Sequence, residues 1–321
     1  MKKKIIIVAA AVLTVIAGCI VMAVGFLMAG LDWRGLSNEK LVKDTEYIDG
    51  YFDSVNVRLS TGDLRLALSQ DGRCRAETNH HEKIDIVFEI VNGELTVREI
   101  DRRKWTDHIS IFTFGESYVT LYLTESAYKS AYLHTSAGDI DVADDFSFEE
   151  LNIKVTTGDV SSRAQVTKRL TVKGSTGSKR ISGIDGCETV RLEGTTGEMT
   201  VADVSCTTLQ LENSTSDMEL RNITAENITI GITTGDIDMH NVVAGTLLEA
   251  IATTGDIEFD FCDGAEVVLK TGAGDVEGSL RTGKIFDVST NTGRVRVPAS
   301  DPNGGLCKVN TNTGDVEIAI K

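Results

Sequence analysis

Thr156-Thr157-Gly158-Asp159 decides the fold, because near-copies of this tetrapeptide return at intervals of 19 to 21 residues to the end of the chain. Apolar residues alternate on both sides of each copy, which is the pattern of β-strands, and a fixed period near 20 residues is typical of solenoids. The sequence therefore predicts an all-β fold, a parallel β-solenoid of about ten coils. The predicted structural turns are Gly62, Gly138, Gly158, Gly177, Gly197, Gly235, Gly255, Gly274, Gly293 and Gly314, with Ser216 as the one exception.

The repeated tetrapeptide has two interpretations. In the first, glycine supplies a backbone conformation with positive φ, and the Ser, Thr and Asp side chains bond to local backbone groups. In the second, the aspartates stack into rows that calcium bridges. The denser Gly and Asp nonapeptide of calcium-binding solenoids is absent, and Ser178 and Arg294 interrupt the row. We favour the structural interpretation and predict no metal site.

The N-terminus carries a long apolar run. Lys2, Lys3 and Lys4 precede residues 5–31, which contain no charged residue. About 20 apolar residues are enough to span a bilayer, and flanking lysines stay on the cytoplasmic side. We expect a cytoplasmic tail (1–4), a single transmembrane helix (5–31) and an extracytoplasmic remainder on the cell membrane. A cleaved signal peptide has a shorter apolar stretch, and a lipoprotein with acylated Cys19 stays open as an alternative.

The external part divides into three segments. Residues 32–50 lack a strand pattern and are interpreted as a linker. Residues 51–130 form an N-terminal β segment, in which Asn92-Gly93 between two alternating runs predicts an antiparallel hairpin. Residues 131–321 carry the uninterrupted solenoid repeats. Within 51–130, the most irregular stretch contains Trp105, Phe112 and Phe114, a candidate binding loop whose alternative is a solvated loop.

Composition limits the function. The formal charge of −16 would repel nucleic acid over most of the surface, so we expect no nucleic-acid partner. No phosphate-binding loop, dinucleotide fingerprint, hydrolase elbow or zinc-protease motif occurs, and the five histidines form no triad signature. We therefore expect no catalytic residues, no cofactor and no enzyme activity.

The cysteines show no zinc-site spacing. Cys187 and Cys206 both lie ten residues before their turn positions, so the repeat predicts that they stack on successive coils. This makes them a candidate disulfide, and the alternative is two small stacked residues at a bend. Cys307 occupies an inward position and is expected to be a buried thiol.

The membrane helix, the strand-rich segment from Tyr118 to Leu123 and the repeated Thr-Thr-Gly-Asp turns together resemble a known group of proteins. It is the bacterial "putative adhesin" family, toast-rack-like β-strand-repeat membrane proteins with a domain of unknown function. The resemblance covers about residues 51 to 321 and implies an envelope protein with a parallel β-solenoid outside the cell.

Three functions follow as hypotheses. The first is a non-enzymatic adhesion or scaffold protein of the cell envelope, with an unknown envelope or surface protein or a glycan as its partner. The second is a regulator or sensor in envelope stress signalling. The third, which we favour least, is an enzyme acting on cell-wall polysaccharide.

Overall fold

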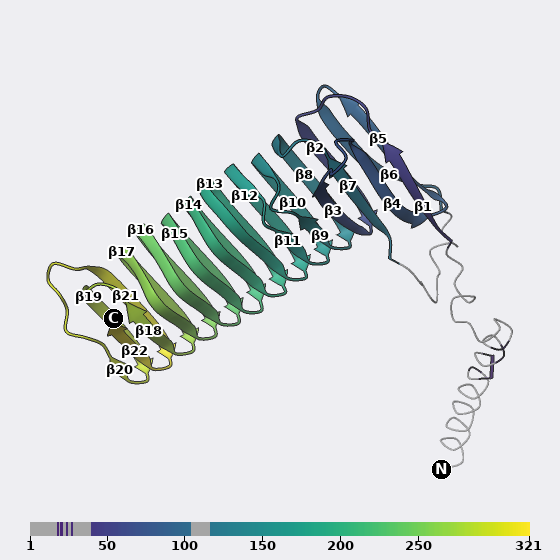
Figure 1. Ribbon diagram of the computed structural model, residues 1–321. Coiled ribbons are helices and arrows are strands. Elements are labelled where there is room, and N and C mark those ends of the chain that lie inside the picture. The colour runs from purple at the N-terminus through teal and green to yellow at the C-terminus, as the bar shows by residue number, and fades with distance from the viewer. Residues whose placement is uncertain (1–17, 19, 22–23, 25–26, 28–39, 104–115) are drawn as a thin grey trace, which may run out of the picture.

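The protein is an elongated rod of stacked β-coils (Figure 1). The computed structural model describes residues 18, 20–21, 24, 27, 40–103 and 116–321. Within these residues no helix is long and apolar enough to cross a membrane. The membrane helix expected over residues 5–31 lies almost wholly outside them. We name each coil by its turn residue, so that the Gly255 coil is the one that turns at Gly255.

The coils pair in parallel and in register. Val201, Leu220, Met239 and Phe259 are successive partners on four coils, and each is at most 3% exposed. Burying one such side chain contributes about 1.5–3 kcal/mol, so the stacked rows form one continuous core. The central strands are β8 (Ala127–Ala137), β9 (Ile140–Val142), β10 (Ser147–Thr157), β11 (Val160–Ser162), β12 (Gln165–Thr176), β13 (Lys179–Thr196), β14 (Met199–Thr215), β15 (Met218–Thr234), β16 (Ile237–Thr254) and β17 (Ile257–Ala273).

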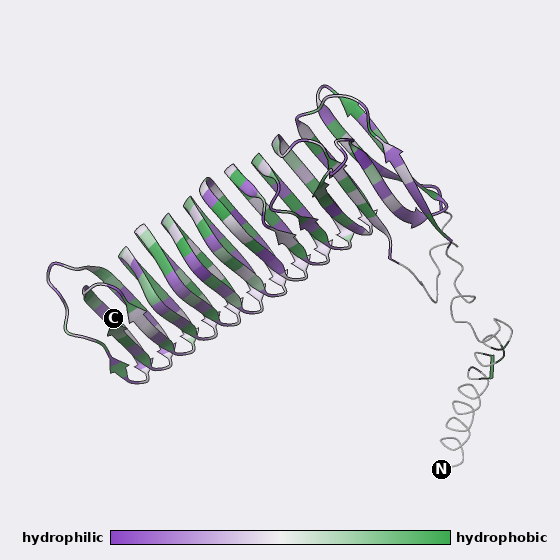
Figure 2. Ribbon diagram, viewed as in Figure 1, coloured by the Kyte–Doolittle hydropathy of each residue, from purple (hydrophilic) through white to green (hydrophobic). Residues whose placement is uncertain are grey.

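Hydropathy alternates along these strands because one set of side chains faces the interior and the other faces solvent (Figure 2). In β15, Met218, Leu220 and Ile223 are fully buried, whereas Glu219 and Arg221 lie between them on the outside. A one-residue slip would move every apolar side chain to the solvent face, which is why the register is so regular. The all-β parallel solenoid of about ten coils is confirmed.

The N-terminal end departs from parallel stacking. β2 (Ser54–Thr61) and β3 (Asp63–Leu68) form the Gly62 coil, which lies beside the Gly138 coil although about 75 residues separate the two turns. β6 (Glu94–Asp101) and β7 (Tyr118–Leu123) pair with the other side of this coil. β5 (Ile84–Val91) pairs antiparallel with β6 across Asn92-Gly93, both with positive φ, as the hairpin prediction requires.

A strand lies where the sequence suggested a linker. β1 (Leu41–Tyr47) falls within residues 32–50 and pairs antiparallel with β4 (Arg75–His81), which itself pairs antiparallel with β7. Almost every residue of β1 is exposed. A strand with no buried face has no apolar alternation, so its sequence carries no signal for strand structure.

The last two coils are stacked out of sequence order. β17 pairs with β21 (Gly305–Thr313), and β18 (Val276–Leu280) pairs with β22 (Val316–Ile320). β19 (Lys284–Thr292) and β20 (Val295–Arg296) pair with the outer side of these strands. The Gly314 coil is therefore inserted between the Gly274 coil and the Gly293 coil, which becomes the end of the rod.

Candidate functional site

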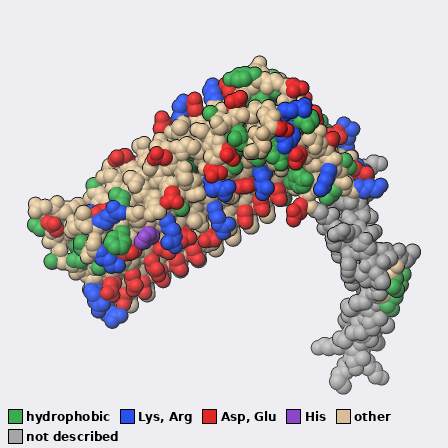
Figure 3. Space-filling model, in the orientation of Figure 1, with side chains coloured by type: hydrophobic (Ala, Val, Ile, Leu, Met, Phe, Trp, Pro, Cys, Tyr) green, Lys and Arg blue, Asp and Glu red, His purple; other side chains and the backbone are tan. Residues whose placement is uncertain are grey.

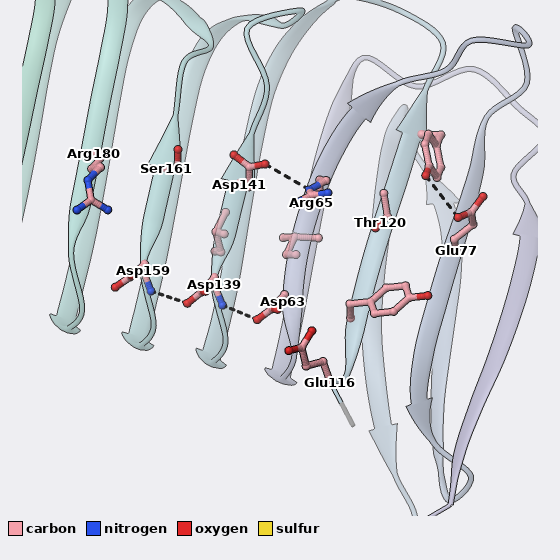
Figure 4. A pocket seen from close by; sticks show the side chains of 14 residues that line it. Asp63, Arg65, Glu77, Glu116, Thr120, Asp139, Asp141, Asp159, Ser161 and Arg180 are labelled. Carbon is pink, nitrogen blue, oxygen red and sulfur yellow. Dashed lines mark hydrogen bonds and ion pairs between the residues drawn. The ribbon is translucent and has the colours of Figure 1, made fainter. Parts of the chain in front are cut away.

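A groove of about 600 Å³ lies on the outer face of the rod, where the N-terminal strands meet the first regular coils (Figure 4). β4, β7, β3, β9, β11 and β13 supply its lining. The lining residues are Asp63, Leu64, Arg65, Glu77, Glu116, Tyr118, Thr120, Tyr122, Asp139, Ile140, Asp141, Asp159, Ser161 and Arg180.

One row of side chains crosses the groove because the strands are in register. Thr120, Arg65, Asp141 and Ser161 are successive partners on β7, β3, β9 and β11. Arg65 Nε lies 3.3 Å from Asp141 Oδ2, and Figure 4 shows the two side chains directed toward one another. Both are solvent-accessible, so this pair contributes at most about 1 kcal/mol to stability, and a ligand can replace it.

A second row is formed by the turn aspartates. Asp63 Oδ1 accepts a hydrogen bond from the Asp139 backbone N–H at 2.9 Å, and Asp139 Oδ1 accepts one from Asp159 at 2.7 Å. Asp159 Oδ1 does the same for Ser178. One carboxylate oxygen of each aspartate therefore serves the turn of the next coil. The same bonds recur along the rod at Asp217, Asp236, Asp256, Asp275 and Asp315.

The far wall is aromatic. Tyr122 donates to Glu77 Oε2 at 3.4 Å, and the Arg75 guanidinium lies 4.1 Å from the centre of the Tyr122 ring. Burial raises the pKa of the Tyr122 hydroxyl, and the charge of Glu77 adds to the effect. The phenol therefore stays protonated at neutral pH and acts as a hydrogen-bond donor.

The groove is electronegative. Six of its lining residues are carboxylates and two are arginines, a formal sum of −4. Its lining includes no histidine or cysteine, and no group of three or more His, Cys, Asp or Glu that could hold a metal ion occurs among the described residues. The arrangement is suited to binding cationic or hydroxyl-bearing groups through carboxylates and tyrosine hydroxyls.

The predicted turn glycines all have positive φ, between 106° at Gly62 and 154° at Gly293, and Ser216 shares this conformation with φ of 118°. A Cβ on Gly255 would lie 1.9 Å from the Gly235 carbonyl oxygen. Glycine is therefore needed for two reasons, the positive φ and the close approach of the neighbouring turn. These positions lie at the edge of the groove and along the rod rather than forming a separate site.

The candidate loop residues Trp105, Phe112 and Phe114 lie outside the described residues. Glu116, which follows this stretch, lines the groove. Cys187 and Cys206 are direct Cα partners on β13 and β14, and both are free thiols in this structure. Burial raises the pKa of Cys206 to about 12, which leaves little thiolate for oxidation. The disulfide stays a prediction.

Sequence reasoning missed the groove residues. Arg65, Tyr118 and Tyr122 belong to strands that are not neighbours in the sequence, and only their non-local pairing brings them together. The available signal was the interruption of the 20-residue period between residues 69 and 130, since that segment supplies the aromatic wall.

A family model described as "Toastrack DUF4097" matches residues 45–318. The chain belongs to the toastrack DUF4097 family. No curated protein matches it. Solved structures with a similar fold include a "putative adhesin" from Bacteroides fragilis, at 14% identity and a TM-score of 0.40 over 87% of this chain and 97% of that one. Another is a "putative adhesin" from Parabacteroides merdae, at 12% identity and a TM-score of 0.46 over 88% and 97%.

A structure described as a "putative lipid binding protein" from Parabacteroides distasonis has 13% identity and a TM-score of 0.48, over 86% of this toastrack chain and 96% of that one. At such low identities these likenesses concern the fold alone. The residues of the groove are therefore interpreted from their own chemistry.

Proposed function

We propose that this toastrack protein is a membrane-anchored, non-enzymatic binding protein of the bacterial cell envelope, acting in adhesion or as a scaffold. The apolar run over residues 5–31 would anchor it, with residues 1–4 in the cytoplasm and the solenoid outside the cell. The groove supports this proposal most directly, because its carboxylates and tyrosine hydroxyls can recognise charged or hydroxyl-bearing groups of a partner.

The partner we propose is a surface protein segment or glycan that presents positive charge. The groove has a formal charge of −4, and the Arg65–Asp141 pair at its centre is exposed. An incoming ammonium or guanidinium would replace Arg65 at Asp141 and donate hydrogen bonds to the Asp141 carboxylate. A neutral or anionic ligand could not take the place of the Arg65 guanidinium at the Asp141 carboxylate.

The test uses full-length protein in the membranes of intact cells, with a lysine-rich peptide and purified cell-wall glycan as probes. Asp141→Arg should reduce binding of the positively charged probe at least tenfold. Asp238→Arg is the matched control, because Asp238 occupies the same outward position of the repeat in a coil remote from the groove. An equal loss of probe binding in both variants would mean that only the overall charge of the rod matters. Unchanged binding in both variants would contradict the assignment of the groove as the binding site.

A regulator of envelope stress signalling is the second candidate, and it would use the same groove for a protein partner. Deleting the gene should then alter induction of an envelope-stress reporter while adhesion of cells to surfaces stays unchanged. Turnover of cell-wall glycan by the purified chain, abolished by one carboxylate substitution, would contradict both functions and support an enzyme.

A further inference from the structure

The C-terminal end of the rod exposes part of its core. In the Gly293 coil, Val295 occupies the inward position that Val316 fills in the neighbouring coil, yet Val295 is 46% exposed and Val316 is 1% exposed. Phe286 and Val288, which pair with fully buried residues of β21, are only half-buried. Terminal coils of solenoids normally carry a polar cap, and these apolar side chains are not such a cap.

The backbone at this end is also open. β19 pairs with β21 on one side, so the N–H and C=O groups of its alternate residues point away from the rod. The following loop covers the first part of this edge, because Asp301 donates its N–H to Lys284 O and Ser300 Oγ accepts the Phe286 N–H. Within the described part of the chain, no strand pairs with the outer side of β19 from Val288 to Thr292.

We propose that two copies of this chain associate tail to tail through the Gly293 coil, with β19 of one copy antiparallel to β19 of the other. A two-fold axis perpendicular to the strands relates the two identical ends and keeps the inward faces of both β19 strands on the same side, so the pairing is antiparallel. A second copy fits because its terminal coil has the same cross-section and the same exposed core positions. The opposite end differs, since antiparallel β5, β4 and β1 are placed around it (Figure 1).

Charge favours this end over side-by-side packing of two such acidic rods. Carboxylates at Glu219, Asp238, Glu258, Glu277 and Glu317 form a row on successive strands. Figure 3 shows acidic side chains gathered along one edge of the rod and basic ones at its C-terminal end. Side-by-side packing of two rods would bring such rows together, which costs free energy through like-charge repulsion.

The row of carboxylates ends in arginine at the proposed interface. Arg294 Nη2 lies 2.8 Å from Asp315 Oδ2, and Arg296 Nη1 lies 3.0 Å from Glu317 Oε2. Residues 284–304 contain three basic and two acidic side chains, a formal sum of +1 in a chain whose total is −16. Two copies can therefore meet at this coil without the repulsion that the rest of the surface imposes.

The experiment uses the full chain in detergent micelles, with mass measured by light scattering. Wild-type protein should be a dimer, and Val295→Arg should shift it to a monomer by placing a charge at the exposed core. Thr253→Arg is the control, an added arginine at an exposed outward position in the middle of the rod. A melting curve of each variant checks that the solenoid is intact.

Cross-linking locates the contact independently of folding effects. Asn291→Cys and Thr253→Cys place a thiol at the same exposed position of the repeat, in the terminal coil and in a central coil. A short bis-maleimide should join two Asn291→Cys chains at least fivefold more efficiently than two Thr253→Cys chains, with wild-type protein as the baseline. A monomeric wild type, a dimer unaffected by Val295→Arg, equal cross-linking of both cysteine variants, or a ladder of longer oligomers would each overturn the proposal.

Discussion

Gly255→Ser tests why glycine recurs at the turns. The wild-type residue has φ of 136°, and a Cβ there would lie 1.9 Å from the Gly235 carbonyl oxygen. Backbone strain at such a φ costs about 1–3 kcal/mol, and relieving the steric overlap costs roughly another 1–3 kcal/mol. We expect the free energy of unfolding of Gly255→Ser to be about 3 kcal/mol or more below that of the wild type.

The chain contains its own comparison at Ser216. This serine adopts φ of 118°, and the neighbouring Gly197 carbonyl accepts a hydrogen bond from Asn213 Nδ2 at 3.0 Å. Ser216→Gly should therefore stabilise the protein by about 1 kcal/mol, since the relief of strain exceeds the extra entropy that glycine loses on folding. The two reciprocal exchanges, Gly255→Ser and Ser216→Gly, should act in opposite directions.

Native-state hydrogen exchange is the suitable assay, because coils of a solenoid can open separately and a single melting temperature averages over them. Gly255→Ser should accelerate exchange most strongly in the amides of β16 and β17, and its melting temperature should fall by roughly 6–12 °C. Unchanged exchange in these strands would refute the argument that steric contact between turns requires glycine.

Three further predictions concern single sites. Glu277→Gln should raise the melting temperature at pH 7, because burial and then the charges of its acidic neighbours raise the pKa of Glu277. Folding therefore disfavours the ionised form, and the stability of the wild type falls as pH rises through that pKa. The advantage of the glutamine variant should vanish in acid, where both side chains are neutral. Lys179→Met should stabilise the protein by about 1 kcal/mol or more, since burial lowers the pKa of the 1% exposed Lys179 and the partner residue on the next coil is Met199. The difference in stability should shrink toward alkaline pH, where the lysine loses its proton. If Cys187 and Cys206 form a disulfide, oxidation of the purified wild-type chain should lower its count of free thiols by two. In Cys206→Ser, the Cys187 thiol should stay free under the same oxidation. Persistence of both thiols in the oxidised wild type would favour the alternative of stacked small residues.

The tertiary structure also contains a second row of special backbone conformations that periodic glycines did not reveal. Asp203, Asn222, Asn241 and Phe261 have φ between 53° and 58° and lie one per coil at intervals of 19 or 20 residues. Asn222 Nδ2 donates to Asp203 Oδ1, and Asn241 Nδ2 donates to Asn222 Oδ1, both at 2.8 Å. The row contains Asp, Asn and Phe instead of one recurring residue type, so the sequence shows only a weak period there. Its Asn and Asp side chains bond to one another only after the coils have stacked.

The sequence by itself determined the repeating unit of this protein. A turn with positive φ and strands with apolar alternation are local properties, so the Thr-Thr-Gly-Asp period predicted the coil and its inward-facing apolar residues. The Asn92-Gly93 dipeptide predicted the hairpin in the same local way. The aspartates of the repeat differ from that local expectation, because their Oδ1 atoms accept backbone N–H groups of the next coil, about 20 residues away, and not groups of their own turn.

Only the tertiary structure decided which coils are neighbours. Coils of nearly equal length and pattern are interchangeable in local terms, so their order depends on non-local strand pairing and on the reach of the connecting segments. This pairing places β7 beside β3 to form the groove and inserts the Gly314 coil between the Gly274 coil and the Gly293 coil. Arg294, an interruption of the aspartate row when the coils are counted in chain order, becomes the residue that ends this row at the tip of the rod.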